Sequence, residues 1–298
     1  MKLYKTSKGI LVESKGMFYL ISEHWDTLIN HNDLHSYLEE LSAAAHQLQI
    51  EEAEEWVLNY LLPPVGQQEV WAAGVTYLRS RDARIEESLA SGGADLYDRV
   101  YDAERPELFF KSLPHRVCGH NQTVYIRRDS SWNVPEPECT LFINSDGHIQ
   151  GYTIGNDMSS RSIEGENALY LPQAKVYQNS AALGPCLYVP AYPLTLSTEI
   201  LMMITRMGQQ RFSDRTTLSQ MKRSFTELAE FLYRECDFIH GAFLMTGTCL
   251  VPDNGFILQE NDRVDITISE IGTLTNMIGY KPVRSSQKIE EKSKLNQL

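Results

Sequence analysis

The chain has 298 residues, of which 42% are hydrophobic, and its formal net charge at pH 7 is -12. This length and apolar content can supply the core of one large domain and one smaller one. The negative charge, with lysines and arginines scattered along the chain, argues against nucleic acid or an anionic membrane surface as the main partner.

Five cysteines, at positions 118, 139, 186, 236 and 249, show no CxxC pair and no metal-ligand spacing. An odd number without such spacing is typical of reduced thiols in a cytoplasm rather than of a disulfide framework. We find no apolar stretch long enough for a signal peptide or for a membrane span, which needs about 18 apolar residues. The sequence therefore predicts a cytoplasmic protein.

The first 65 residues are expected to form a small α+β domain. Residues 1–22 alternate apolar and polar positions, which predicts two or three short strands. A helix is expected over residues 34–48, with Asn32 as its N-cap, and a second helix over residues 51–61. The pair Pro63-Pro64 ends the second helix and marks the boundary to a larger domain.

A buried strand is predicted over residues 70–75, and a highly charged helix over residues 77–87. The glycines at 92 and 93 interrupt that helix. A charged helix followed by glycines is most often a solvated face, but the same pattern can form a mobile lid over a site. Further strands are predicted over residues 106–111 and 115–128. The lysine that ends the first of them, Lys111, is expected either to orient substrate or ligands or simply to pack.

An acidic stretch at residues 132–138 is the strongest site candidate. Glu136 and Glu138 are two residues apart, and Pro135 and Pro137 exclude a helix, so both carboxylates point to one face of an extended strand. A lone pair of this kind is usually a solvated strand end. Here the pair lies within a run of aromatic and aliphatic residues, which favours a site.

A hairpin after this stretch supplies a third carboxylate, Asp157. Residues 139–143 and 148–155 predict its strands, and residues 144–147 its turn. Within one residue, the pairing places Glu138 opposite Thr153 or Ile154, and Glu136 opposite Gly155 or Asn156. Three oxygen ligands on facing strand ends are expected to suit Mg²⁺, Mn²⁺ or Ca²⁺.

Two cationic residues follow Asp157. Arg161 is four residues on, and Lys175 lies among largely uncharged residues. Such a lysine is costly to bury unless it faces anions, which metal-bound carboxylates and a substrate supply. The alternative is a surface lysine whose stem packs while its ammonium stays hydrated.

The C-terminal third predicts strands over residues 194–210 and 257–271, and a helix over residues 213–236 capped by Ser213 or Asp214. Residues 243–248 predict a strand that ends in a turn of small residues, where Thr248 and backbone N–H groups could hold a carboxylate. The polar tail at residues 285–298 is expected to be frayed.

Several of these motifs, in this order, resemble the fumarylacetoacetate hydrolase family. They are Glu136-x-Glu138, the run from Gly151 to Arg161, Gln173-Ala174-Lys175 and Thr246-Gly247-Thr248. The resemblance covers residues 66 to 283. It implies an α+β fold that is mostly β, with the rolled β-sheet core of the family's C-terminal domain over residues 66–284 and a homodimer as the assembly.

Within that family, the sequence of the acidic stretch and of residues 155–175 is most similar to the branch of 2-keto-3-deoxy sugar-acid dehydratases. The resemblance implies that Glu136, Glu138 and Asp157 hold Mg²⁺, with Mn²⁺ or Ca²⁺ as alternatives, and that Lys175 serves proton transfer or enolate stabilisation. Substrate contacts are expected from Arg161, Thr248, Lys111, Tyr77 and Ser80. The expected reaction is removal of a C3 proton followed by loss of the C4 hydroxyl.

The hydrolases of the family carry Asn-Tyr-x-x-His, whose histidine activates water, where this chain has Thr76, Tyr77 and Ser80. Without that base, elimination is favoured over hydrolysis. Glu86 or Glu87 could take over the role of the base, so a hydrolase of a 2,4-diketo acid stays an alternative. A catalytically silent keto-acid-binding protein is the second alternative.

Overall fold

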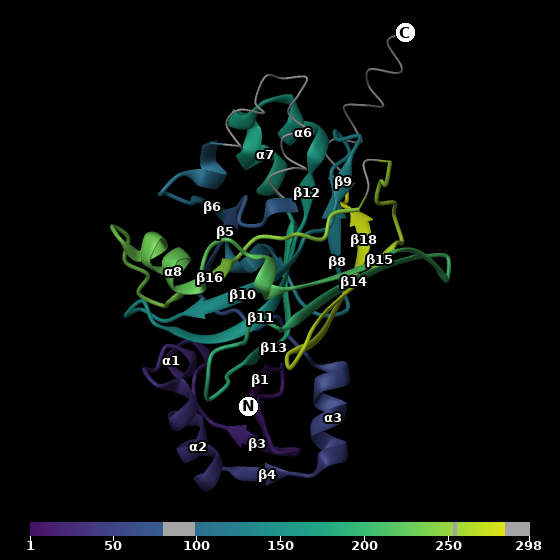
Figure 1. Cartoon of the computed structure of the whole chain (residues 1–298). Helices are drawn as coiled ribbons and strands as arrows, with labels where there is room; N and C mark the ends of the chain where they lie inside the picture. The colour runs from purple at the N-terminus through teal and green to yellow at the C-terminus, as the bar shows by residue number, and fades with distance from the viewer. Residues whose placement is uncertain (80–98, 253–254, 284–298) are drawn as a thin grey trace.

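The computed structural model describes residues 1–79, 99–252 and 255–283, and Figure 1 shows the arrangement of its elements. The fold is mixed α and β and mostly β, as predicted. The predicted charged helix at residues 77–87 and the polar tail lie largely outside the described residues.

The N-terminal residues form an antiparallel meander with helices packed on it, at the lower end of Figure 1. Its strands are β1 Lys2–Lys5, β2 Ile10–Ser14, β3 Met17–Ile21 and β4 His46–Leu48, and its helices are α1 Trp25–Ile29, α2 Leu34–Ala44 and α3 Ile50–Asn59. β1 pairs antiparallel with β13 (Ala181–Tyr188). The meander therefore continues the main sheet rather than forming a sheet of its own.

The N-cap prediction for α2 was wrong by one residue. Asp33 precedes the helix in a left-handed conformation and makes no side-chain cap. The Asn32 side chain is instead used in a tertiary contact, because its Nδ2 donates to Asp146 and its Oδ1 accepts from Asn144 Nδ2 at 2.6 Å. Asn32 thus anchors the turn of the distant hairpin.

The main sheet runs in the order β4-β3-β2-β1-β13-β11-β10-β16-β5-β6, with β7 attached to β13. Its further strands are β5 Glu69–Gly74, β6 Glu107–Ser112, β7 Val117–Cys118, β10 Pro137–Ile143, β11 Ile149–Asp157 and β16 Ala242–Met245. Every residue of β10 is buried. Leu141 and Ile143 pack toward the second sheet and Phe142 toward the core beneath α1 and α2, so both faces of the sheet are covered.

The predicted hairpin is β10 with β11, and its register lies within the one-residue margin of the prediction. Glu138 pairs with Gly155, because a bulge between Phe142 and Ile143 adds one residue on the returning strand. The Asp157 N–H donates to the Glu136 carbonyl oxygen at 2.9 Å, which extends the pairing to the strand ends. Cross-strand partners share a face, so the three carboxylates meet on one side.

A second sheet has the order β15-β14-β17-β18-β8. Its strands are β8 Gln122–Ile126, β14 Glu199–Arg206, β15 Gln209–Thr217, β17 Arg263–Ile268 and β18 Gly272–Tyr280. The helix predicted over residues 213–236 was therefore wrong in its first half. Met207 and Gly208 both have positive φ, of 51° and 75°, and turn the chain back into a hairpin. Helix α8 spans only Phe225–Tyr233 and is capped by Ser224, whose hydroxyl accepts from the Glu227 N–H.

The short elements before β10 and after β11 lie next to the carboxylates in the chain. They are β9 Asn133–Val134, which pairs with β12 Ser159–Ser160, and the helices α6 Arg161–Glu166 and α7 Leu171–Lys175. Three 3-10 turns complete the described elements, at Pro114–Arg116, Ala168–Tyr170 and Leu218–Gln220. Helices α6 and α7 lie at the end of the molecule opposite the N-terminal helices (Figure 1).

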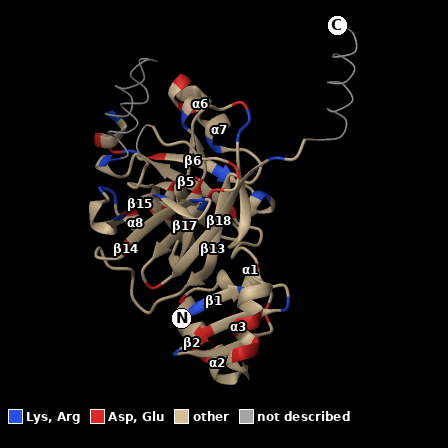
Figure 2. Cartoon of the chain, turned by 90° about the vertical axis from the view of Figure 1, so that its right-hand side faces the viewer, with Lys and Arg blue, Asp and Glu red and all other residues tan. Residues whose placement is uncertain are grey.

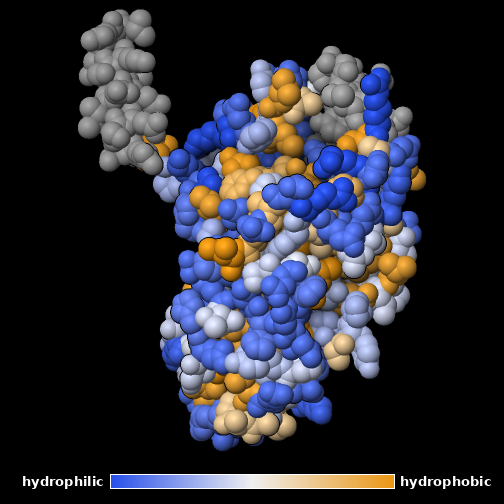
Figure 3. Space-filling model, turned by 90° about the vertical axis from the view of Figure 1, so that its left-hand side faces the viewer, coloured by the Kyte–Doolittle hydropathy of each residue, from blue (hydrophilic) through white to orange (hydrophobic). Residues whose placement is uncertain are grey.

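The surface is polar and the charges are spread over it. Figure 2 shows acidic residues along α3 and basic residues scattered along the rest of the chain, and the face in Figure 3 is predominantly hydrophilic with small hydrophobic groups. None of the described helices combines the length and apolar character that crossing a bilayer requires.

Candidate metal centre

The carboxylates of Glu136, Glu138 and Asp157 form a buried cluster at the end of the β10–β11 hairpin. One ligand atom from each lies within 4.8 Å of the others, and the three residues are 3%, 1% and 1% exposed. Solvation by water therefore contributes little to offset their mutual repulsion. The sequence prediction that these carboxylates meet is confirmed.

This donor set fits a hard divalent cation. All three ligands are oxygens, which Mg²⁺ and Ca²⁺ prefer, and they lie within 4.8 Å of one another, close enough for one ion to contact all three. Burial, together with the negative charges of Asp157 and Glu136, raises the pKa of the Glu138 carboxyl well above its usual range. A cation bound among the three oxygens would remove that penalty.

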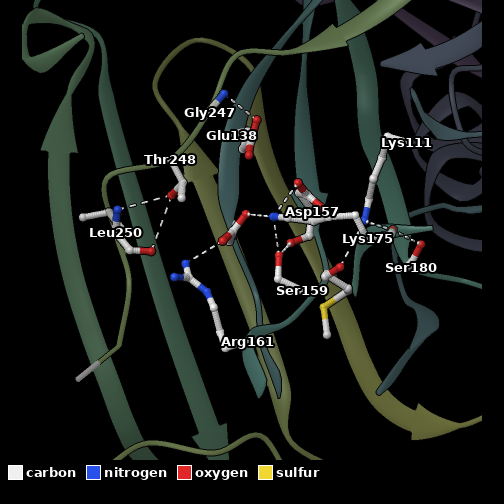
Figure 4. Close-up of polar contacts among 12 residues, drawn as sticks. Lys111, Glu138, Asp157, Ser159, Arg161, Lys175, Ser180, Gly247, Thr248 and Leu250 are labelled. Atoms are coloured by element: carbon white, nitrogen blue, oxygen red, sulfur yellow. Dashed lines mark hydrogen bonds and ion pairs between the residues drawn. The ribbon is translucent and has the colours of Figure 1, made fainter. Parts of the chain in front are cut away.

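Two cations pair with the outer oxygens of the cluster (Figure 4). The Lys175 ammonium lies 2.5 Å from Glu136 Oε2 and 3.0 Å from Asp157 Oδ2, and it donates to Ser159 Oγ at 2.6 Å. Arg161 donates through a terminal guanidinium nitrogen to Glu136 Oε1 at 2.5 Å. Both are buried, so the alternative of a hydrated surface Lys175 is wrong.

Lys111 has a different environment. Its side chain is fully buried, and its ammonium donates to the carbonyl oxygens of Met158 at 3.0 Å and Lys175 at 2.5 Å while pairing with Asp157 Oδ1 at 2.5 Å. Burial lowers the pKa of Lys111, and the Asp157 carboxylate opposes that shift. The residues that line the cavity at the carboxylates include Lys175 but not Lys111. The geometry therefore favours orientation of Asp157 and of the chain at Lys175 by Lys111 over direct contact with a substrate.

The opposite rim is formed by the turn after β16. The Gly247 N–H donates to Glu138 Oε2 at 2.6 Å. The neighbouring Thr248 lines the same cavity, and its hydroxyl accepts from the Leu250 N–H at 3.2 Å. The predicted turn of small residues is present, and its backbone contacts a carboxylate of the protein itself.

Tyr77 is also near the cluster. Its ring is buried next to the end of β5, where its backbone forms an isolated bridge with Met221. Burial is the main cause that raises the pKa of the Tyr77 hydroxyl well above its usual value, with the Glu138 carboxylate adding to it. Ser80, Glu86 and Glu87 lie outside the described residues.

The sequence analysis did not single out three further residues. Ser159 binds the Lys175 ammonium, Gly247 binds Glu138, and Glu164 is buried on α6 three residues after Arg161. Serine and glycine carry no chemical signal of their own in the sequence. The buried Glu164 could have been suspected from the spacing that puts it on the same helical face as Arg161.

The described side chains leave little space in this centre. The cavity among Phe109, Lys175, Thr248 and the carboxylates measures about 10 Å³, close to the minimum for one water molecule. A substrate can bind there only if the side chains separate. A cavity of about 470 Å³ beside Tyr125, Arg128 and Lys281 is larger but includes none of the three clustered carboxylates.

Comparison with known proteins agrees with this geometry. Residues 93–279 match the family described as fumarylacetoacetate (FAA) hydrolase C-terminal. A Haloferax volcanii protein described as probable 2-keto-3-deoxyxylonate dehydratase is 49% identical over 218 residues, which are 72% of this chain and 73% of that protein. The 2-dehydro-3-deoxy-D-arabinonate dehydratase of Saccharolobus solfataricus is 40% identical over 228 residues, which are 76% of this chain and 75% of that protein.

A solved structure is similar over almost the whole chain. The 2-keto-3-deoxy-D-arabinonate dehydratase complexed with magnesium and 2,5-dioxopentanoate superposes with a TM-score of 0.81 at 30% identity, covering 95% of this chain and 100% of that one. The similarity therefore includes the N-terminal meander as well as the sheet that carries the carboxylates.

Proposed function

The chain belongs to the fumarylacetoacetate hydrolase family, and from that premise we propose that it is a magnesium-dependent dehydratase of a 2-keto-3-deoxy sugar acid. The observation that carries the proposal is the buried cluster of Glu136, Glu138 and Asp157 with the Lys175 ammonium against it. The relatives at 49% and 40% identity are described as dehydratases of such acids. A similar solved structure contains magnesium together with 2,5-dioxopentanoate, which has the composition of a five-carbon 2-keto-3-deoxy acid less one water.

We assign Glu136, Glu138 and Asp157 as the residues that hold the divalent ion. When bound, Mg²⁺ supplies Lewis acidity toward the carboxylate and 2-keto oxygens of the substrate and so acidifies its C3 protons. Mn²⁺ has the same preference for oxygen ligands and is expected to substitute.

The charge balance of the described site supports an anionic substrate. The cluster contains three buried carboxylates, those of Glu136, Glu138 and Asp157, and three buried cations pair with it: Lys111, Lys175 and Arg161. With every group ionised, this set carries no net charge. A bound divalent ion makes the net charge positive, and a substrate carboxylate reduces it. Buried charge that is compensated is much less costly than unpaired charge.

Lys175 is our candidate for proton transfer. Its ammonium is held by Glu136, Asp157 and Ser159, and Lys175 lines the same cavity as the three carboxylates. Loss of the C3 proton and departure of the C4 hydroxyl then complete the elimination, with the proton transferred to the leaving oxygen. Glu86 and Glu87 stay alternative candidates for the base.

The remaining substrate contacts follow from the rim of the site. Arg161 and Thr248 line the cavity and can donate to substrate oxygens. Tyr77 and Ser80 stay predicted contacts, and Lys111 is proposed to act on Asp157 instead. The substrate is a small-molecule 2-keto acid, and a homodimer and a cytoplasmic location stay predictions.

The test is metal-dependent turnover of a 2-keto-3-deoxypentonate. Purified protein with Mg²⁺ is expected to release a product lighter by one water, EDTA to abolish the reaction, and fresh Mg²⁺ or Mn²⁺ to restore it. Glu138→Gln should require far more Mg²⁺ for the same rate. Undiminished turnover of wild-type protein or of Glu138→Gln in EDTA would show that the assignment of the metal centre is wrong.

A further inference from the structure

Two neighbouring strand ends close one side of the metal centre. β5 and β16 run parallel and are paired, and both continue into residues with a left-handed backbone, Val75 at φ 52° and Gly247 at φ 93°. A β-branched residue in this region is a genuine outlier. Strain of this kind persists only where the surrounding structure enforces it.

A single peptide unit joins these ends to the cluster. The Thr76 hydroxyl donates to the Thr246 carbonyl oxygen at 2.6 Å, and the N–H of the same peptide, that of Gly247, donates to Glu138 Oε2 at 2.6 Å. The C=O and N–H of a trans peptide lie in one plane and point in opposite directions. Fixing the oxygen therefore fixes the direction of the N–H, and each bond polarises the other.

The packing leaves no room for the peptide between Thr246 and Gly247 to move. Thr76 is fully buried, and a Cβ added to Gly247 would lie 2.0 Å from Thr76 Oγ1 and 3.1 Å from the Ala73 carbonyl oxygen. Thr246 is held from its other side, because its N–H and hydroxyl both donate to the Cys139 carbonyl oxygen, at 3.1 and 2.8 Å. Cys139 directly follows Glu138. The turn after β16 therefore binds both the backbone next to Glu138 and the Glu138 carboxylate.

We infer that Thr76 is a positioning residue for the metal centre, which acts on Glu138 through the peptide between Thr246 and Gly247. The inference rests on the proposed role of Glu138 as a metal ligand. Residues that orient a ligand without touching the ion change metal affinity by about 10–100-fold when they are removed. The effect should appear in Mg²⁺ binding itself, before any substrate is added.

The experiment measures Mg²⁺ affinity by calorimetry on metal-free protein. Thr76→Val removes the hydroxyl at nearly constant volume and should weaken Mg²⁺ binding about tenfold. Thr76→Ser keeps the hydroxyl and should stay within about threefold of wild type. Thr140→Val is the matched control, because Thr140 is equally buried and lies on β10 two residues from Glu138, yet its Oγ1 has no hydrogen-bond partner among the described residues. Its Mg²⁺ affinity should be unchanged.

Three outcomes would overturn the inference. In the first, Thr76→Val melts at a lower temperature but binds Mg²⁺ like wild type, which makes Thr76 a purely structural residue. In the second, Thr140→Val weakens binding as much as Thr76→Val does. In the third, Thr76→Ser loses Mg²⁺ affinity although it retains the hydroxyl. If Thr76→Val does not fold, the Mg²⁺ affinity of Thr76→Ser alone decides whether the inference holds. If wild-type protein itself binds no Mg²⁺, the proposed function fails first, and the two failures are thereby distinguished.

Discussion

At the level of single residues, the Lys175 ammonium binds two carboxylates that are also the proposed metal ligands. Lys175→Met should lower kcat by about 100-fold or more, because it removes the proton-transfer group. It should also lower the melting temperature of the metal-free protein, since Glu136 and Asp157 lose their buried partner. Added Mg²⁺ should raise that temperature by more than it does in wild type.

Lys175→Arg separates the two effects. Arginine keeps the positive charge but does not give up its proton in proteins, so this variant should remain inactive while its metal-free melting temperature lies closer to wild type. Near-normal kcat with a raised KM in Lys175→Met would instead identify a residue that only binds substrate. Kinetics and thermal melts with and without Mg²⁺ decide between these possibilities.

His120 gives a pH dependence of stability. Burial lowers its pKa from the ordinary value of 6.5. The charge of Arg263 also lowers this pKa, whereas the charge of Asp265 raises it. Its Nδ1 accepts from the Thr275 N–H at 3.2 Å, which requires an unprotonated Nδ1. The unfolded chain then binds a proton more readily, so the free energy of unfolding should fall as pH drops below about 6.5. His120→Asn should flatten this slope in urea titrations between pH 7.5 and 5.5, and an unchanged slope would contradict the assignment.

The three carboxylates could be predicted because alternation along a strand and hairpin pairing are local rules. They place Glu136 and Glu138 on one face and bring Asp157 beside them. The roles of Ser159 and Gly247 could not be predicted in this way. Each acts through a hydroxyl or a backbone N–H whose partner is distant in sequence, and nothing in the residue type indicates that partner.

At the level of elements, Arg223 anchors the segment of residues 99–104. Its side chain is 6% exposed, and it donates to the carbonyl oxygens of Ala103 at 2.6 Å and Glu104 at 3.1 Å. Arg223→Gln should cost about 2 kcal/mol of unfolding free energy, because hydrogen bonds from a buried charged group are lost.

Lys222 is the matched control beside it. It pairs with Asp102 at 2.7 Å, but its side chain is 35% exposed, so Lys222→Gln should cost less than about 1 kcal/mol. Urea unfolding of the two variants tests the difference. Equal losses would mean that burial does not set the strength of these anchors.

The helix expected over residues 213–236 shows why some elements could not be predicted. Periodicity favoured a single helix, but the hairpin turn at Met207 and Gly208 commits residues 209–217 to pairing with β14. Tertiary pairing of this kind overrides local preference. The register of β10 with β11 could be predicted only to within one residue, because nothing in the sequence indicated the bulge between Phe142 and Ile143.

At the scale of the whole molecule, the β1–β13 pairing joins the N-terminal meander to the sheet that carries the carboxylates. A boundary near Pro63-Pro64 was expected from composition, and the division of the chain there stays a prediction. Edge-to-edge pairing between strands so far apart in sequence leaves no local signal, so the continuous sheet could not have been derived from periodicity alone.

The central functional claim about the whole molecule is that it catalyses elimination rather than hydrolysis. Both reactions would use the proposed metal centre to bind a 2-keto acid, so we predict that both kinds of substrate bind and that the discrimination lies in kcat. Thr76 is fully buried and its hydroxyl is bonded to Thr246. An asparagine at this position, which the resemblance implies for the hydrolases, would remove the hydroxyl that binds the Thr246 carbonyl oxygen.

The most direct measurement places a 2-keto-3-deoxypentonate and an acylpyruvate together in one vessel with purified protein and Mg²⁺, and follows both by mass analysis over time. Our account predicts that the sugar acid loses one water while the acylpyruvate stays intact or is cleaved far more slowly. Cleavage of the acylpyruvate with uptake of water, at a rate well above any dehydration, would contradict it.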